Sequence, residues 1–177
     1  MHIQVEPGVR LFVDIEGAGL VPDGPVMREK PTLLPLHGGP GYDHSSFKPL
    51  FSQLADVAQV VYVDHRGHGR SDRRPASEWT LDTFADDVVR LCDALGIVKP
   101  VVLGQSFGGF VAQRYLARHP AHPARVVLSS TSTGHCTLAR PGSKSIVCCS
   151  PLADANRMSV LNSVRLLTSS SVACVLL

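Results

Sequence analysis

Residues 101–108 constrain the fold of this chain more than any other segment. Val101, Val102 and Leu103 form a short apolar run of the kind seen in buried strands, and the run breaks at Gly104-Gln105-Ser106-Phe107-Gly108. A segment with helical spacing follows as far as about His119, where Pro120 stops it. Strands that pass directly into helices are typical of parallel sheets joined by helical crossovers. The segment therefore predicts an α/β fold with a mostly parallel sheet.

The same alternation extends over the first 130 residues. Four strands are predicted, at 31–36, 57–63, 100–105 and 125–130. A helix is predicted from Leu81 to Leu95, with Thr80 as its N-cap and Gly96 as its C-terminal stop. Residues 2–15 alternate with period two around Pro7-Gly8 and predict an antiparallel hairpin. Residues 17–30 carry glycine, proline and charge, and predict a loop.

The composition changes near residue 134. All ten aromatic residues lie before position 116, and fourteen of the fifteen acidic residues lie before position 94. A folded core needs large side chains to fill it. We therefore expect residues 1–134 to form the N-terminal part of an α/β domain, incomplete on its C-terminal side, and residues 135–177 to be a poorly packed or disordered tail.

Charge, hydropathy and cysteine content exclude several classes of protein. The formal charge of +2 is too small and too scattered to predict binding to nucleic acid or to an anionic membrane. No apolar run approaches the roughly 20 residues that span a bilayer, and no signal peptide is apparent. The five cysteines show neither a zinc pattern nor a disulfide framework. The terminal Cys174-Val175-Leu176-Leu177 fits a prenylation box, but no polybasic run accompanies it, so we interpret the match as coincidental. A cytoplasmic protein without metal or other cofactor is expected.

Ser106 is the predicted nucleophile. A nucleophilic serine needs its hydroxyl exposed at the carboxyl edge of the sheet, on a turn too tight for side chains two residues before and after it. Gly104 and Gly108 supply that room, with Gln105 and Phe107 beside the serine. The helix that follows directs the positive end of its dipole at developing negative charge. The alternative is a glycine-rich turn with an ordinary serine.

His37-Gly38-Gly39-Pro40-Gly41 follows the earlier strand and predicts an oxyanion loop. An oxyanion hole needs backbone N–H groups held toward one point, and glycines let the backbone approach a substrate closely. The expected donors are the amides of Gly39 and of Phe107, the residue after the nucleophile. His37 lies in the loop that builds the hole, so we interpret it as a buried loop organiser in preference to a general base.

Together, HGGPG, DHRGHGRSD and GQSFGG, in this order, resemble the α/β-hydrolase fold and its proline iminopeptidase-like branch over residues 1–133. The resemblance implies Ser106 as nucleophile, Gly39 and Phe107 as oxyanion donors, and structural roles for Asp64 and Arg66. The reaction that the resemblance favours is release of an N-terminal proline from peptides through an acyl-enzyme. Many iminopeptidases have Trp and Gln where this chain has Phe107 and His65, which leaves a carboxylesterase-like hydrolase of small esters or amides as an alternative.

The triad partners expected after Ser106 are not recognisable. In this fold an acid and then a histidine follow the nucleophile, yet the one later acid is Asp154 and no histidine comes after it. His119 and His122 fall at the far end of the nucleophile helix, roughly 20 Å from Ser106 at 1.5 Å per residue. His135 follows the last predicted strand and is a weak candidate. The family's helical cap is also missing, so we expect this chain to be inactive alone. A non-catalytic fragment or binding module remains open.

Overall fold

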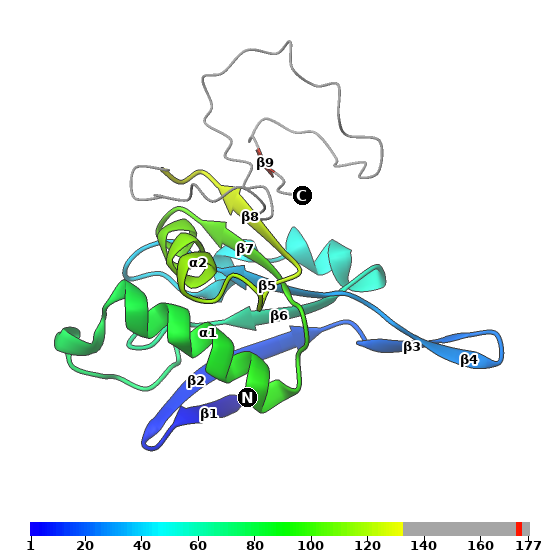
Figure 1. The fold of residues 1–177 in the computed structure, drawn as a ribbon, viewed down its shortest axis with the longest axis horizontal. Helices are drawn as coiled ribbons and strands as arrows, with labels where there is room; N and C mark the ends of the chain where they lie inside the picture. The colour runs from blue at the N-terminus through cyan, green and yellow to red at the C-terminus, as the bar shows by residue number, and fades with distance from the viewer. Residues whose placement is uncertain (133–172, 175–177) are drawn as a thin grey trace, which may run out of the picture.

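The computed structural model describes residues 1–132 and 173–174. Seven strands form one sheet in the order β1-β2-β6-β5-β7-β8-β9 (Figure 1). The strands of this sheet are β1 (His2–Glu6), β2 (Val9–Glu16), β5 (Thr32–Leu36), β6 (Gln59–Val63), β7 (Val101–Gln105), β8 (Arg125–Ser129) and β9 (Ala173–Cys174). The helices are α1 (Leu81–Leu95) and α2 (Phe107–Arg118), with three short 3₁₀ segments, η1 (His44–Phe47), η2 (Phe51–Asp56) and η3 (Ala76–Glu78).

The four central strands β6, β5, β7 and β8 are parallel, and antiparallel strands flank them on both sides. The predicted strands are confirmed with small shifts at their ends, and so is the N-terminal hairpin, in which β1 pairs with β2. Parallel neighbours need crossover connections, and α1 and α2 supply them between β6, β7 and β8. The α/β architecture expected from the sequence is therefore the one observed.

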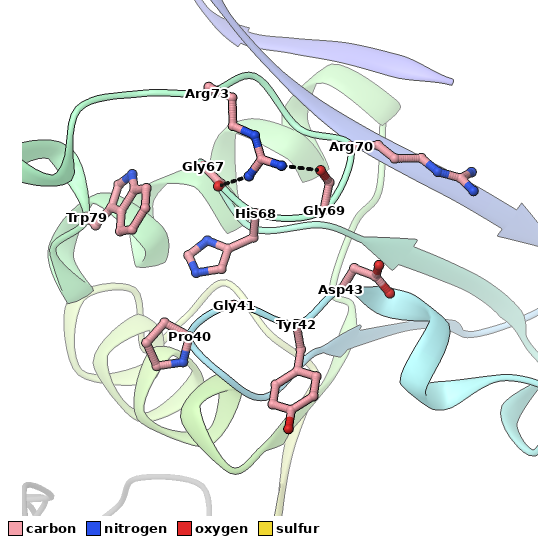
Figure 2. A pocket seen from close by; sticks show the side chains of 10 residues that line it. All are labelled: Pro40, Gly41, Tyr42, Asp43, Gly67, His68, Gly69, Arg70, Arg73 and Trp79. Carbon is pink, nitrogen blue, oxygen red and sulfur yellow. Dashed lines mark hydrogen bonds between the residues drawn. The ribbon is translucent and has the colours of Figure 1, made fainter.

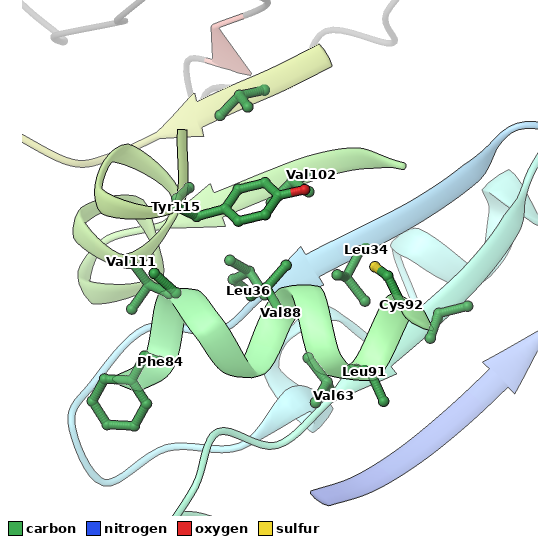
Figure 3. Close-up of a cluster of buried hydrophobic side chains, with 14 of the residues drawn as sticks. Leu34, Leu36, Val63, Phe84, Val88, Leu91, Cys92, Val102, Val111 and Tyr115 are labelled. Atoms are coloured by element: carbon green, nitrogen blue, oxygen red, sulfur yellow. The ribbon is translucent and has the colours of Figure 1, made fainter. Parts of the chain in front are cut away.

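The main core lies between the sheet and the two helices. Alternate residues along β6 face opposite sides: Val61 and Val63 pack beneath α1 and α2, whereas Val60 and Tyr62 join Phe47 on the side of η1 and η2. Figure 3 shows the main cluster, in which side chains of α1 and α2 meet those of the central strands. This packing on both faces fixes the ends of β5, β6 and β7 relative to one another.

Helix α1 begins and ends as the sequence predicts. The Thr80 hydroxyl accepts a hydrogen bond from the Thr83 amide at 3.1 Å. At the other end Gly96 takes the left-handed conformation with φ +66°, which a residue without Cβ adopts at little cost. The helix is thus bounded by local side-chain chemistry as well as by its buried face.

The prediction of a loop over residues 17–30 is wrong. This segment forms a hairpin of β3 (Leu20–Asp23) and β4 (Val26–Glu29), which projects from the domain (Figure 1). The turn between the strands is Gly24-Pro25, with Gly24 at φ +62°. Most side chains of this hairpin are exposed, so the segment lacks the alternation of buried and exposed residues by which a strand is recognised in sequence.

The predictions for the tail fall almost entirely outside the described residues, and this includes His135 and Asp154. Within the tail, Ala173–Cys174 is described as a short strand that pairs with Leu128 and Ser129 of β8. Over the described part of the chain, neither helix has the length and apolar character needed to cross a membrane.

Candidate active site

Ser106 lies at the turn between β7 and α2, where the sequence places it. Its side chain is exposed, and its backbone has φ 51° and ψ −115°, a conformation that non-glycine residues rarely adopt. Neighbouring backbone leaves no room for a side chain at either flanking glycine. A Cβ on Gly104 would lie 2.4 Å from the Gly108 carbonyl oxygen, and one on Gly108 would lie 2.0 Å from the Leu36 carbonyl oxygen. The tight turn that exposes Ser106 therefore depends on glycine at both positions.

The loop after β8 holds this turn in place. The Ser106 amide donates to the Ser129 carbonyl at 3.0 Å, and the Thr131 hydroxyl donates to the Ser106 carbonyl at 2.8 Å. Sequence reasoning missed the role of Thr131. The available signal was its position just after a predicted strand adjacent to the one that ends at Ser106.

The predicted oxyanion loop passes directly beside the serine. A Cβ built on Gly38 would lie 3.3 Å from the Ser106 Cβ and 3.8 Å from its Oγ, so the loop backbone lies against the hydroxyl. Phe107 is the first residue of α2, where backbone N–H groups lack partners within the helix. Among the described residues no hydrogen bond engages the amide of Gly39 or Phe107, or the Ser106 hydroxyl. The assignment of donors and nucleophile stays a prediction that this geometry permits.

His37 has both ring nitrogens engaged within the protein. Its Nδ1 lies 2.7 Å from the Gly38 carbonyl oxygen and its Nε2 accepts a hydrogen bond from the His65 amide at 3.0 Å. The side chain is fully buried, and burial lowers its pKa. This arrangement fits an organiser that fixes the loops after β5 and β6, and it leaves no nitrogen free to accept a proton from Ser106.

Arg66 belongs to the loop after β6. Its side chain is buried and surrounded by carboxylates from three other segments. Its Nε and Nη2 donate to Asp87 of α1 at 2.9 and 2.6 Å, and its Nη1 donates to Glu6 and Glu78 at 2.6 and 3.0 Å. Burial alone would lower the pKa of Arg66, but these carboxylates raise it above its ordinary value. The guanidinium therefore stays charged and joins β1, η3 and α1 to the loop.

Asp64 is likewise saturated by donors. Its Oδ1 accepts from the backbone amide and Nδ1 of His44 at 2.9 and 2.7 Å, and its Oδ2 accepts from the Arg70 amide at 2.8 Å. Asp43, His44 and Asp64 bring potential metal-ligand atoms within 4.8 Å of one another. Because the Asp64 oxygens already accept three N–H bonds, this group does not fit a metal ion. The structural roles implied for Asp64 and Arg66 agree with these contacts.

The two histidines at the far end of α2 are engaged there. His119 Nε2 lies 2.9 Å from Asp86 of α1, and His122 Nδ1 contacts the Tyr115 hydroxyl. No hydrogen bond links a histidine to Ser106 within residues 1–132. The described part of the chain thus combines a serine turn with a glycine loop, and neither residue of the acid–base pair is found beside them.

Comparison with known proteins assigns the chain to a family that has this fold. The family model for the alpha/beta hydrolase fold matches residues 31–145, and the chain belongs to that family. Among curated relatives, it is 35% identical over 127 residues to the proline iminopeptidase PfmaB of Pestalotiopsis fici, covering 70% of this chain and 44% of that protein. It is 38% identical over 109 residues to a proline iminopeptidase of Lactobacillus helveticus, covering 58% of this chain and 36% of that protein.

Solved structures show the same fold around different activities. The proline iminopeptidase-related protein of Thermus thermophilus superposes with a TM-score of 0.61 at 31% identity, covering 74% of this chain and 44% of that one. An esterase of Exiguobacterium antarcticum superposes with a TM-score of 0.62 at 26% identity, covering 74% and 45%. The chain spans less than half the length of these relatives, so their activities are not carried over with the fold.

Proposed function

We propose that this chain carries the nucleophile and the oxyanion hole of a serine hydrolase acting on small amides or esters. The observation that supports this most directly is the state of Ser106: exposed, held in a rare backbone conformation, and adjacent to a glycine loop and a helix N-terminus. Strained backbone of this kind costs about 1–3 kcal/mol and persists where the surroundings impose it, commonly at active sites.

In the proposed reaction the Ser106 Oγ attacks the substrate carbonyl and a base takes the hydroxyl proton. The amides of Gly39 and Phe107 donate hydrogen bonds to the oxyanion, and the positive end of the α2 dipole adds to them. The amine or alcohol then leaves with a proton, and water hydrolyses the acyl-enzyme. The favoured substrate is a peptide with N-terminal proline, since two of the relatives cited above are proline iminopeptidases.

A carboxylesterase-like activity is the second candidate. It is supported by the structural neighbour from Exiguobacterium antarcticum, which is an esterase with similar coverage of this chain. Comparison of turnover on proline-naphthylamide and on p-nitrophenyl acetate distinguishes the two. In either case we expect turnover at least about 10³-fold below that of a full-length relative, because residues 1–132 place neither the acid nor the base that accelerates such reactions beside Ser106.

A fluorophosphonate probe tests the proposed nucleophile independently of substrate. Because no base is found beside Ser106 within residues 1–132, we expect a covalent adduct to form slowly on the Ser106 peptide, followed over hours by mass spectrometry, and none in Ser106→Ala. Ser46→Ala is the matched control, because Ser46 is exposed on η1 and should leave labelling unchanged. Failure of the probe to label protein shown to be folded by circular dichroism would replace this proposal with a non-catalytic fragment or binding module.

A further inference from the structure

A cavity of about 610 Å³ lies between the loop after β5 and the loop after β6, and Ser106 is not among its lining residues. Pro40, Gly41, Tyr42 and Asp43 form one wall, and residues 67–70 with Arg73 and Trp79 form the other. Cavities of 300–1,000 Å³ with a few converging polar groups are typical of small-molecule sites. The glycine loop that passes Ser106 thus has a second, hollowed side (Figure 2).

His68 presents a hydrogen-bond acceptor to this cavity. The residue is 3% exposed, and its Nδ1 lies 2.8 Å from the Arg66 carbonyl oxygen. A carbonyl can only accept, so Nδ1 carries the hydrogen, and in the neutral ring Nε2 carries a lone pair. No described residue donates to Nε2. Figure 2 shows the ring directed into the space between Pro40 and Trp79.

The other groups of the wall restrict the charge of a ligand. The Asp43 carboxylate has its pKa lowered by hydrogen bonds from Ser45, so it is ionised at neutral pH and disfavours an anion. Arg73 donates to the Gly67 and Gly69 carbonyls, and the Arg70 guanidinium lies over the Phe12 ring, 4.9 Å from its centroid. These two nearby positive charges disfavour a cation, and the Arg73 donors are already engaged by the two backbone carbonyls.

Two aromatic side chains supply apolar surface beside these polar groups. Trp79 packs against the His68 ring with 5.1 Å between centroids, and it closes over Gly67, where a Cβ would lie 2.5 Å from the indole. Tyr42 extends from the opposite wall and is 66% exposed. Rings of this kind combine an apolar face with a polar edge.

We infer that this cavity binds a small neutral ligand bearing hydroxyl groups next to an apolar face, with one hydroxyl donating to His68 Nε2. A sugar or polyol has this chemistry. The Asp43 carboxylate accepts from a second hydroxyl, and Trp79 covers the apolar face, with Tyr42 at the rim of the cavity. The inference is independent of the proposed hydrolase activity, because none of these groups contacts Ser106 among the interactions described.

The single tryptophan of the chain lies in this cavity, so intrinsic fluorescence reports on it directly. We expect D-glucose to change Trp79 emission saturably, and sodium acetate and methylammonium chloride at equal ionic strength to leave it unchanged. In ¹⁵N-histidine-labelled protein, glucose should shift the Nε2 resonance of His68. Loss of one hydrogen bond predicts about a tenfold higher half-saturation concentration for His68→Phe.

His119→Phe is the matched control, since His119 lies at the far end of α2 and should leave glucose binding unchanged. If His68→Phe fails to fold, the shift of the His68 Nε2 resonance in the unaltered chain still tests whether glucose binds at His68. Saturation by acetate or methylammonium in place of glucose, no response to any probe, or a glucose response that leaves Nε2 unmoved would each overturn the inference. Adduct formation at Ser106 is measured separately, so failure here does not affect the proposed nucleophile.

Discussion

Strands β6 and β7 end at the same edge of the sheet, yet the polar side chains in the loops that follow them have opposite environments. After β6, Asp64 and Arg66 are buried and their charged atoms are paired with donors or carboxylates from distant segments. After β7, Ser106 is exposed, its backbone is strained and no described residue forms a hydrogen bond with its hydroxyl. Polar residues at strand ends are therefore not equivalent: the paired charges of Asp64 and Arg66 build the scaffold, and the exposed Ser106 hydroxyl is the candidate for chemistry.

The largest expected effect is a loss of free energy of unfolding when the ion pairs around Arg66 are broken. Asp87→Ala removes the most buried partner of the Arg66 guanidinium, a carboxylate that accepts two of its hydrogen bonds, and breaking a buried ion pair in this way costs about 3–5 kcal/mol. Asp82→Ala is the control, because Asp82 pairs with Arg114 on the exposed surface, where such pairs contribute about 0–1 kcal/mol. Urea denaturation measures both. Equal losses in the two variants would show that the loop after β6 is not held by this network.

A smaller loss is expected where α2 crosses the end of β5. Gly108→Ala places a methyl group 2.0 Å from the Leu36 carbonyl oxygen, and the backbone must move to accept it. Overpacking of this kind costs about 1–3 kcal/mol. Gly19→Ala is the control, because its methyl group would meet only the flexible Gln59 side chain, at 3.1 Å. The free energy of unfolding should fall clearly in Gly108→Ala alone; a similar fall in both would contradict the close approach.

Acid should weaken the scaffold through its buried histidines. Burial lowers the pKa of His37 and His65 in the folded protein below the ordinary 6.5. Below pH 6.5 the unfolded chain binds protons that the folded chain does not, so stability present at higher pH is lost as the pH falls. Between pH 7.5 and 5.5 each histidine contributes a loss of up to about 1.4 kcal/mol.

His65→Phe should flatten this dependence, because phenylalanine keeps the ring beside Phe84 and Phe107 and does not titrate. The variant also removes His65 Nε2, which is buried and has no hydrogen-bond partner among the described residues. Urea denaturation at the two pH values measures the change. An unaltered slope in His65→Phe would mean that other groups cause the acid sensitivity.

The features predictable from the sequence are those that local chemistry determines. The turn at Ser106 follows from two glycines between a strand and a helix, and α1 follows from Thr80 and Gly96 at its ends. The partners of Arg66 were not predictable, because Glu6 and Asp87 lie 60 and 21 residues away and meet it only in the folded sheet. The role of His68 depends in the same way on Trp79 and on the glycine loop, which no spacing in the sequence brings together.

The smallest expected effect has the opposite sign and bears on the strain at Ser106. Its φ of 51° suits glycine better than serine, so Ser106→Gly should relieve about 1–3 kcal/mol of backbone strain. This relief exceeds the roughly 0.5–1 kcal/mol lost because glycine gives the unfolded chain more freedom, so the free energy of unfolding should rise slightly. The serine is exposed and its hydroxyl forms no hydrogen bond with a described residue, so little is lost on the folded side. Ser77→Gly, on the exposed 3₁₀ segment η3, should instead lower stability by about 0.5–1 kcal/mol, because glycine gives the unfolded chain more freedom. Opposite signs in urea denaturation would show that the turn after β7 is maintained at a cost to stability, unlike the loop after β6. If both variants lose stability alike, the conformation of Ser106 is unstrained, and the contrast between the two loops reduces to a difference in burial.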